Sequence, residues 1–159
     1  MTRYSQTYPE IQNLTMMAEE AINSIKLKEL NAHLCIGVGT PLCLLKSISK
    51  LAGLSTDNKM TLANSAHNEV RANLASSPHL SSDVAWQLLG DRSEDVLKCL
   101  ALNEHLTDEL YLALSNINSE AVRANLALNT SISDEVLANL HQDPSWDVQH
   151  SLAVTYCLN

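Results

Sequence analysis

The feature that most restricts the fold of this chain is an internal repeat of 26 residues. The six residues VRANLA occur at 70–75 and again, letter for letter, at 122–127, and a diverged unit that begins VLKCLA at 96–101 aligns without gaps halfway between them. One column of aligned valines runs through the units: Val70, Val96, Val122 and Val148. A period of this length predicts a stack of similar units, each of which buries its apolar face only against its neighbours.

Two helical segments are predicted in each unit, because a Ser or Thr precedes acidic residues and an apolar pair spaced i, i+4. The first segments open at Ser93, Ser119 and Ser145. The second segments open at Ser81, Thr107 and Ser133. Each segment has only two to three turns and is too short to be stable alone in water. Leu and Ala supply most apolar content and Phe is absent, so we expect an all-α fold of packed short helices.

The repeat also predicts the domain organisation. We expect a helical repeat array over residues 40–159 and an N-terminal helical cap over residues 1–39, because the end of such a stack needs an atypical cover. The units of the array are a degenerate copy at 40–69, three clear copies at 70–95, 96–121 and 122–147, and a partial copy at 148–159.

The segment VRANLALNTSISDEVLANLHQDPSWDV, residues 122–148, resembles the leucine-rich repeat variant family, relatives of the HEAT-like helical repeats. The resemblance implies a right-handed α-solenoid in which α-helices alternate with shorter, partly 3₁₀ segments, the second segment of each unit being the one that tightens. One type of family member carries an N-terminal iron–sulfur cluster. Only Cys35 and Cys43 stand in the corresponding part of this chain, and a cluster needs four thiolates, so we expect no cofactor.

Acidic residues dominate the repeat array. Residues 65–159 contain 13 acidic and four basic residues, too few cations for direct nucleic-acid binding. Most of the acids fall at predicted helix starts, where the helix dipole favours them, so a structural role and a role in steering a basic partner both stay open. The candidate partner-binding acids are Glu94, Asp95, Asp108, Glu109, Glu120, Asp134 and Glu135.

Three apolar residues are candidate anchors for a partner: Trp86, Leu112 and Trp146. If the second segment of each unit is α-helical, Trp86 lies opposite the inward pair and forms an exposed strip with Leu112 and Ala138. If that segment is 3₁₀, the phase changes and Trp86 belongs to the core. Trp146 occupies a first-turn position, where it either anchors a partner or packs on Pro144.

Columns of charged residues predict ties between units. Arg71 and Arg123 share one column and Asp91 and Asp143 share another, and in HEAT-like stacks such columns form an Arg–Asp ladder. Three residues interrupt the ladder here: Leu97, Ile117 and Gln149. We expect structural ties rather than a binding site.

The C-terminal end of the array offers four candidate dimer-interface residues: Leu152, Val154, Tyr156 and Leu158. No second segment follows them to cover their apolar side chains. Either the tail folds back, or two copies join at this end as a twofold dimer.

No motif for catalysis, metal binding or phosphate binding is found, and His79 and His105 share a column but stand a full unit apart. We therefore expect no bound metal. The sequence also indicates no signal peptide and no membrane span, so we expect a cytoplasmic protein. We expect a non-catalytic protein–protein interaction module that presents a repeated acidic and apolar surface to a protein partner. The alternative is an acidic inhibitor that imitates nucleic acid and occupies a DNA- or RNA-binding enzyme.

Overall fold

The computed structural model describes residues 42–51 and 53–157, so the predicted cap at 1–39 lies outside the described residues. Within the described ranges every regular element is helical and there is no strand, which confirms the all-α prediction. None of these helices combines the length and apolar character that a membrane crossing requires.

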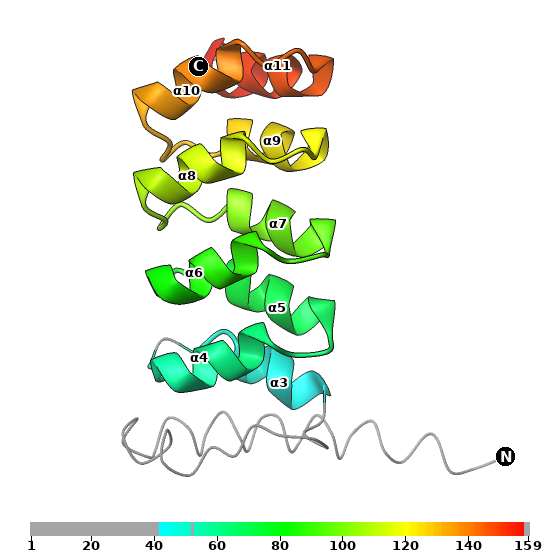
Figure 1. Ribbon diagram of the computed structural model, residues 1–159, viewed down its shortest axis with the longest axis vertical. Coiled ribbons are helices and arrows are strands. Elements are labelled where there is room, and N and C mark those ends of the chain that lie inside the picture. The colour runs from blue at the N-terminus through cyan, green and yellow to red at the C-terminus, as the bar shows by residue number, and fades with distance from the viewer. Residues whose placement is uncertain (1–41, 52, 158–159) are drawn as a thin grey trace, which may run out of the picture.

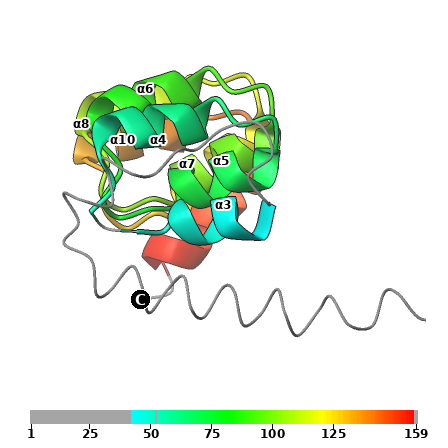
Figure 2. The same ribbon diagram turned by 90° about the horizontal axis from the view of Figure 1, so that it is seen from below.

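The helices stand in two columns (Figure 1). One column holds α3 (Leu42–Ile48), α5 (Asn68–Ala75), α7 (Glu94–Ala101), α9 (Glu120–Ala127) and α11 (Trp146–Leu152), followed by the π-helix η1 (Ala153–Cys157). The other column holds α4 (Thr56–Ala63), α6 (Ser82–Leu89), α8 (Asp108–Ser115) and α10 (Asp134–His141). Viewed from below, the two columns form two adjacent layers (Figure 2). From α4 onward, the starts within each column are 26 residues apart.

The predicted helix starts are confirmed. The N-cap residues of α6 to α11 are Ser81, Ser93, Thr107, Ser119, Ser133 and Ser145. In α9 the cap side chain accepts a hydrogen bond of 3.3 Å from the backbone N–H of Val122. The capping residues thus stand where the sequence pattern indicated, although among these six helices only the α9 cap side chain accepts a hydrogen bond from the backbone of its own helix.

The expectation of partly 3₁₀ segments is wrong for the described helices. The second segments α4, α6, α8 and α10 are α-helices of eight residues, as long as the helices of the other column. Val84 and Leu88 of α6 are both buried, and a four-residue spacing places two side chains on one face of an α-helix. Bonds of the tighter 3₁₀ type are found at helix ends, as where Asp91 N–H donates to Leu88 O and Leu110 N–H donates to Thr107 O, both at 3.0 Å.

The aligned apolar columns form the core. The four aligned valines are fully buried, and so are the leucines and alanines that follow them in α5, α7 and α9. Each leucine of this kind contributes about 1.5–3 kcal/mol of hydrophobic stabilisation. Because α5 packs on α7, α7 on α9 and α9 on α11, these residues form one continuous interior along the stack.

Buried asparagines connect successive units. Asn103 Nδ2 donates to Ala75 O at 2.7 Å and to Ser77 O at 2.9 Å, and Asn129 Nδ2 makes the equivalent bonds one unit later, to Ala101 O at 2.8 Å and Asn103 O at 3.1 Å. Each side chain thus satisfies backbone carbonyls at the end of the preceding helix of its column. These bonds tie each unit to the one before it.

The predicted Arg–Asp pairs form at two positions, but both partners of each pair belong to the same unit, so the expectation that they tie one unit to the next is wrong. Arg71 Nε and Nη2 donate to Asp91 at 2.6 and 3.0 Å, while Nη1 donates to Ser65 O at 2.7 Å. Arg123 and Asp143 repeat this fork at 2.5 and 3.2 Å. The hydrogen bond from Arg123 holds the pKa of Asp143 below its ordinary value, so that this carboxylate stays ionised.

The unit between these two pairs carries apolar residues at the same positions. Leu97 replaces the arginine and Ile117 replaces the aspartate, and both pack against the core. In the last unit Gln149 replaces the arginine and donates to three backbone carbonyls, the shortest bonds being 2.9 Å to Leu140 O and Asp143 O. At the interruptions predicted from the sequence, apolar packing or hydrogen bonds from Gln149 therefore replace the ion pair.

Candidate functional site

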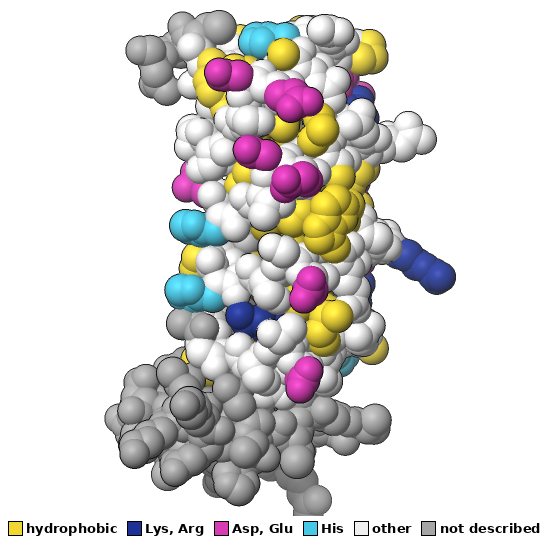
Figure 3. Space-filling view, turned by 60° about the vertical axis from the view of Figure 1, so that its left-hand side comes forward, with side chains coloured by type: hydrophobic (Ala, Val, Ile, Leu, Met, Phe, Trp, Pro, Cys, Tyr) yellow, Lys and Arg dark blue, Asp and Glu magenta, His cyan; other side chains and the backbone are white. Residues whose placement is uncertain are grey.

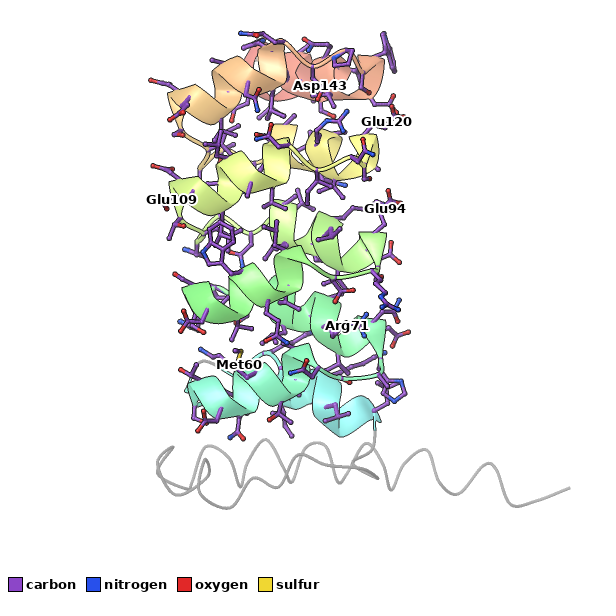
Figure 4. All side chains as sticks on the ribbon, viewed as in Figure 1. Met60, Arg71, Glu94, Glu109, Glu120 and Asp143 are labelled. Carbon is purple, nitrogen blue, oxygen red and sulfur yellow. The ribbon has the colours of Figure 1, made fainter. Side chains whose placement is uncertain are left out.

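An exposed apolar strip crosses the outer side of α4, α6, α8 and α10. Because α6 is α-helical, Trp86 points away from the buried pair and is 46% exposed, so the alternative that places Trp86 in the core is wrong. Leu112 is half-buried and Ala138 exposed at the equivalent positions. Met60, labelled on α4 in Figure 4, stands 26 residues before Trp86 and extends the strip. We call these four residues the apolar row.

Met60 is absent from the predicted strip, although its distance from Trp86 in the sequence is one repeat length and marks it as the equivalent residue. The degenerate character of the first unit conceals it, since Lys59 and Met60 replace more typical residues. Apolar side chains gather on this face at mid-height in the space-filling view (Figure 3).

Carboxylates lie one helical turn from the apolar row. The acidic row consists of exposed residues in the first turns of α6, α8 and α10: Asp83, Asp108, Glu109, Asp134 and Glu135. Each precedes its apolar neighbour by three or four residues and so shares its helix face. Figure 3 shows acidic side chains at several levels of this face.

The acidic row is not neutralised within its own column. The one lysine of α4, α6, α8 and α10 is Lys59, which is buried, donates from Nζ to His79 O, and has its pKa lowered by that burial. Hydrogen bonds from its own backbone N–H and from the Thr107 hydroxyl lower the pKa of Glu109, which keeps it ionised. This face therefore carries net negative charge at neutral pH.

Two equivalent clefts lie at the other ends of these helices. The N-terminal cleft, about 550 Å³, is lined among others by Asn64, Ser65, Arg71, Gln87, Asp91 and Arg92. The C-terminal cleft, about 350 Å³, is lined among others by Asn116, Ile117, Arg123, Asn139, Asp143 and Pro144. Each residue of the second group stands 52 positions after its counterpart in the first. The two copies of VRANLA thus contribute equivalent residues, Arg71 and Arg123, to two equivalent clefts.

Side-chain amides join the clefts to the apolar row. Asn64 Nδ2 donates to Met60 O at 2.8 Å, and Asn116 Nδ2 donates to Leu112 O at 2.7 Å. Gln87 Nε2 donates in turn to Asn64 Oδ1 at 2.8 Å. Asn64 and Asn116 consequently lie one helical turn beyond the apolar row, on the side away from the acidic row, and Gln87 directly follows the residue of the row in α6.

The remaining predicted anchors lie on a different side of the molecule. Glu94 and Glu120 occupy first turns of the α7 and α9 column, and Figure 4 shows them on the side opposite to Met60 and Glu109. Trp146, their counterpart in α11, is 72% exposed and stacks on His150 with ring centroids 4.9 Å apart. The structure therefore divides the predicted partner-binding residues into two groups that share no face.

The acids of this second group serve partly as ties between units. The Ser119 hydroxyl donates to Glu94, and the Ser145 hydroxyl donates to Glu120 at 3.1 Å. The bond from Ser119, together with nearby Lys98, lowers the pKa of Glu94. Asp95 is exposed, with Lys98 Nζ at 3.7 Å. For Glu94 and Glu120 the structural role that the sequence left open is thus observed.

At the C-terminal end, Leu152 is buried, 2% exposed, and is not available to a second copy. Val154 is 44% exposed, and the Tyr156 hydroxyl donates to Asn129 O at 2.7 Å, which folds the tail back onto the preceding unit. Leu158 lies outside the described residues. Leu102 and Leu128, at the positions equivalent to Val154, are also exposed and form a second apolar row that the prediction lacks.

Comparisons of the chain with protein-family models, with curated proteins and with solved structures find no significant match. The geometry of the helix face described above carries the functional argument. Acidic, apolar and carboxamide side chains follow one another there within two helical turns, and the same order recurs in successive units. This arrangement offers charge, contact area and hydrogen bonds to a ligand that lies along the stack.

Proposed function

We propose that this protein is a non-catalytic protein–protein interaction module that binds a basic segment of a partner protein across α4, α6, α8 and α10. The single observation that carries the proposal is Trp86, nearly half exposed beside a row of unneutralised carboxylates. Tryptophan is enriched among the residues that dominate binding energy at interfaces, and surrounding charge accelerates encounter with a partner of opposite sign. The second group of predicted anchors, around Trp146, lies on another side of the molecule and is not part of this surface.

We also propose that the stack is a right-handed solenoid related to the leucine-rich repeat variant type, with α-helices in place of the 3₁₀ segments, and that it works in the cytoplasm. The constant spacing of helix starts and the burial of the aligned valine, leucine and alanine columns support this assignment. A rigid stack suits a binding role, because it presents its surface rows without the entropy loss of ordering a loop.

The alternative, imitation of nucleic acid, has weaker support. DNA carries one charge per 1.7 Å of axis, or roughly six per 10 Å, whereas the acidic row supplies at most two carboxylates per unit, and packed helices stand about 8–10 Å apart. The charge density falls short about threefold. Exposed apolar residues inside the acidic face also have no counterpart on a phosphate backbone.

Selection from a random peptide library displayed on phage tests the proposed function. We expect peptides enriched in Lys or Arg together with apolar residues, and binding at least about tenfold weaker to Trp86→Ala, the size of a typical interface anchor. Trp146→Ala is the matched control, because it removes the other tryptophan from a different side. If no peptide distinguishes the wild type from Trp86→Ala, the proposal is wrong.

Salt separates the two candidate functions. Raising ionic strength from about 0.1 M to about 1 M shortens the Debye length from about 10 Å to about 3 Å. Binding through the apolar row should persist with a moderate loss, whereas a nucleic-acid mimic should lose its target almost completely. Complete loss of peptide binding at high salt would favour the mimic.

A further inference from the structure

The apolar row has a period that restricts the conformation of its ligand. Adjacent helices of one column pack about 8–10 Å apart, so the row offers one apolar side chain about every 8–10 Å. A polyproline II chain has three residues per turn and rises about 3.1 Å per residue, which brings every third side chain to the same side about 9 Å apart. Successive side chains of such a chain therefore match successive units.

Other peptide conformations fit the row less well. On a β-strand, side chains of one face recur about every 7 Å, out of step with the units. On an α-helix they recur about every 5–6 Å and form a broad stripe, which needs a wide apolar groove. Here the apolar row is one residue wide, bounded by Asp108 and Glu109 on one side and by Asn116 on the other.

Hydrogen bonding points to the same conformation. A polyproline II backbone has no internal hydrogen bonds, so its carbonyl groups need outside donors, whereas the carbonyls of an α-helix are already paired. The clefts beside the row contain the carboxamides of Asn64, Gln87, Asn116 and Asn139. Each of their NH2 groups already donates one hydrogen bond of 2.7 or 2.8 Å within the protein and has a second N–H, which we assign to the ligand. The exposed face of Trp86 offers a flat surface of the kind on which proline-rich segments dock.

We propose that the apolar row and the two clefts bind a basic segment in the polyproline II conformation, with an apolar residue at every third position. Apolar side chains of the segment contact Met60, Trp86 and Leu112, its backbone carbonyls accept hydrogen bonds from the carboxamides, and its Lys or Arg residues face the acidic row. This inference rests on the proposed function, since it names the ligand of the same surface.

Three synthetic peptides of equal net charge test the inference. The first is four Leu-Pro-Lys triplets, the second has the same composition with the leucines out of period, and the third is an amphipathic helix with leucine at every seventh position. The chain contains two tryptophans, so Trp146→Phe leaves Trp86 as the single tryptophan reporter of binding. We expect the triplet peptide to shift the Trp86 emission and to bind at least about tenfold more tightly than the other two.

Variants in the clefts check the backbone contact. Asn116→Ala removes a carboxamide near Leu112 and should weaken the triplet peptide several-fold, whereas Asn125→Ala, on the other column, should not. Equal or tighter binding of the out-of-period or helical peptide would overturn the inference while leaving the proposed function intact. Absence of binding by all three peptides would overturn it too, and the phage selection then decides separately whether the surface binds peptides at all.

Discussion

At the scale of single residues, the buried asparagines hold each unit to the one before it. Asn103→Ala removes the two bonds to Ala75 O and Ser77 O and leaves these carbonyls without a side-chain donor, so we expect the free energy of unfolding to fall by roughly 2–3 kcal/mol. Urea denaturation followed by circular dichroism measures it. Asn125→Ala, which loses only a bond to Ala121 O within its own helix, should change stability by about 0.5 kcal/mol or less. Equal losses in both variants would contradict the role given to Asn103.

The role of these buried asparagines could not be predicted from the sequence. The valine and leucine columns could be predicted because hydrophobic burial follows a period that is visible in one sequence. A polar residue such as Asn103 looks the same in the sequence whether it is solvated or buried. Its role depends on which carbonyls of the preceding unit are left without partners, and that is a property of the packed stack.

At the scale of helices and their connections, the chain contains its own substitute for the Arg–Asp pair. Arg123→Leu alone leaves Asp143, whose side chain is 7% exposed, without its partner, and should cost roughly 2–4 kcal/mol of unfolding free energy. The double variant Arg123→Leu with Asp143→Ile copies Leu97 and Ile117 and should recover most of that loss. Chemical denaturation of the single and double variants measures the recovery, and a double variant as unstable as the single one would contradict the equivalence.

The ion pairs also give stability a defined pH dependence. The pKa of Asp143 is lowered in the folded state, so its contribution is fully present above the unfolded value of about 3.9 and is lost as pH falls through the lower folded value. The double variant has no carboxylate at position 143 and therefore lacks this pH-dependent contribution to stability. We therefore expect the stability difference between wild type and double variant to shift in favour of the variant below about pH 4. A difference that is constant from pH 7 to about pH 3 would contradict it.

Helix boundaries were predictable because capping residues and acids mark the starts, whereas the nature of the second segment was not. The family resemblance implied partial 3₁₀ structure, but the buried pair at Val84 and Leu88 requires α-helical spacing. The same outcome decided the candidate site, since only an α-helix exposes Trp86. The helix type of this segment thus determines whether Trp86 is a core residue or an exposed anchor.

At the scale of the whole molecule, the tail folds back, but the second apolar row remains exposed along the stack, and we expect two copies to associate through this row. Val154 is exposed in line with Leu102 and Leu128, so a second copy has an apolar row to cover even though Leu152 is buried. Sedimentation equilibrium at tens of micromolar should give a dimer, and Val154→Asp should give a monomer, because it places a charge in the contact. A monomeric wild type would remove this proposal. Ser131→Asp is a matched control, since this exposed residue lies outside the row.

Contacts in this stack join segments that are close in sequence, and this affects how the chain refolds and how it unfolds under force. The hydrogen bonds from Asn103 to the preceding unit span only 26 to 28 residues of sequence, as they join it to Ser77 O and Ala75 O. Loops that short close quickly, so folding can start in any pair of neighbours and spread in both directions. If the chain is pulled by its ends, we expect it to unfold in small, nearly equal extension steps, with one pair of helices released in each step.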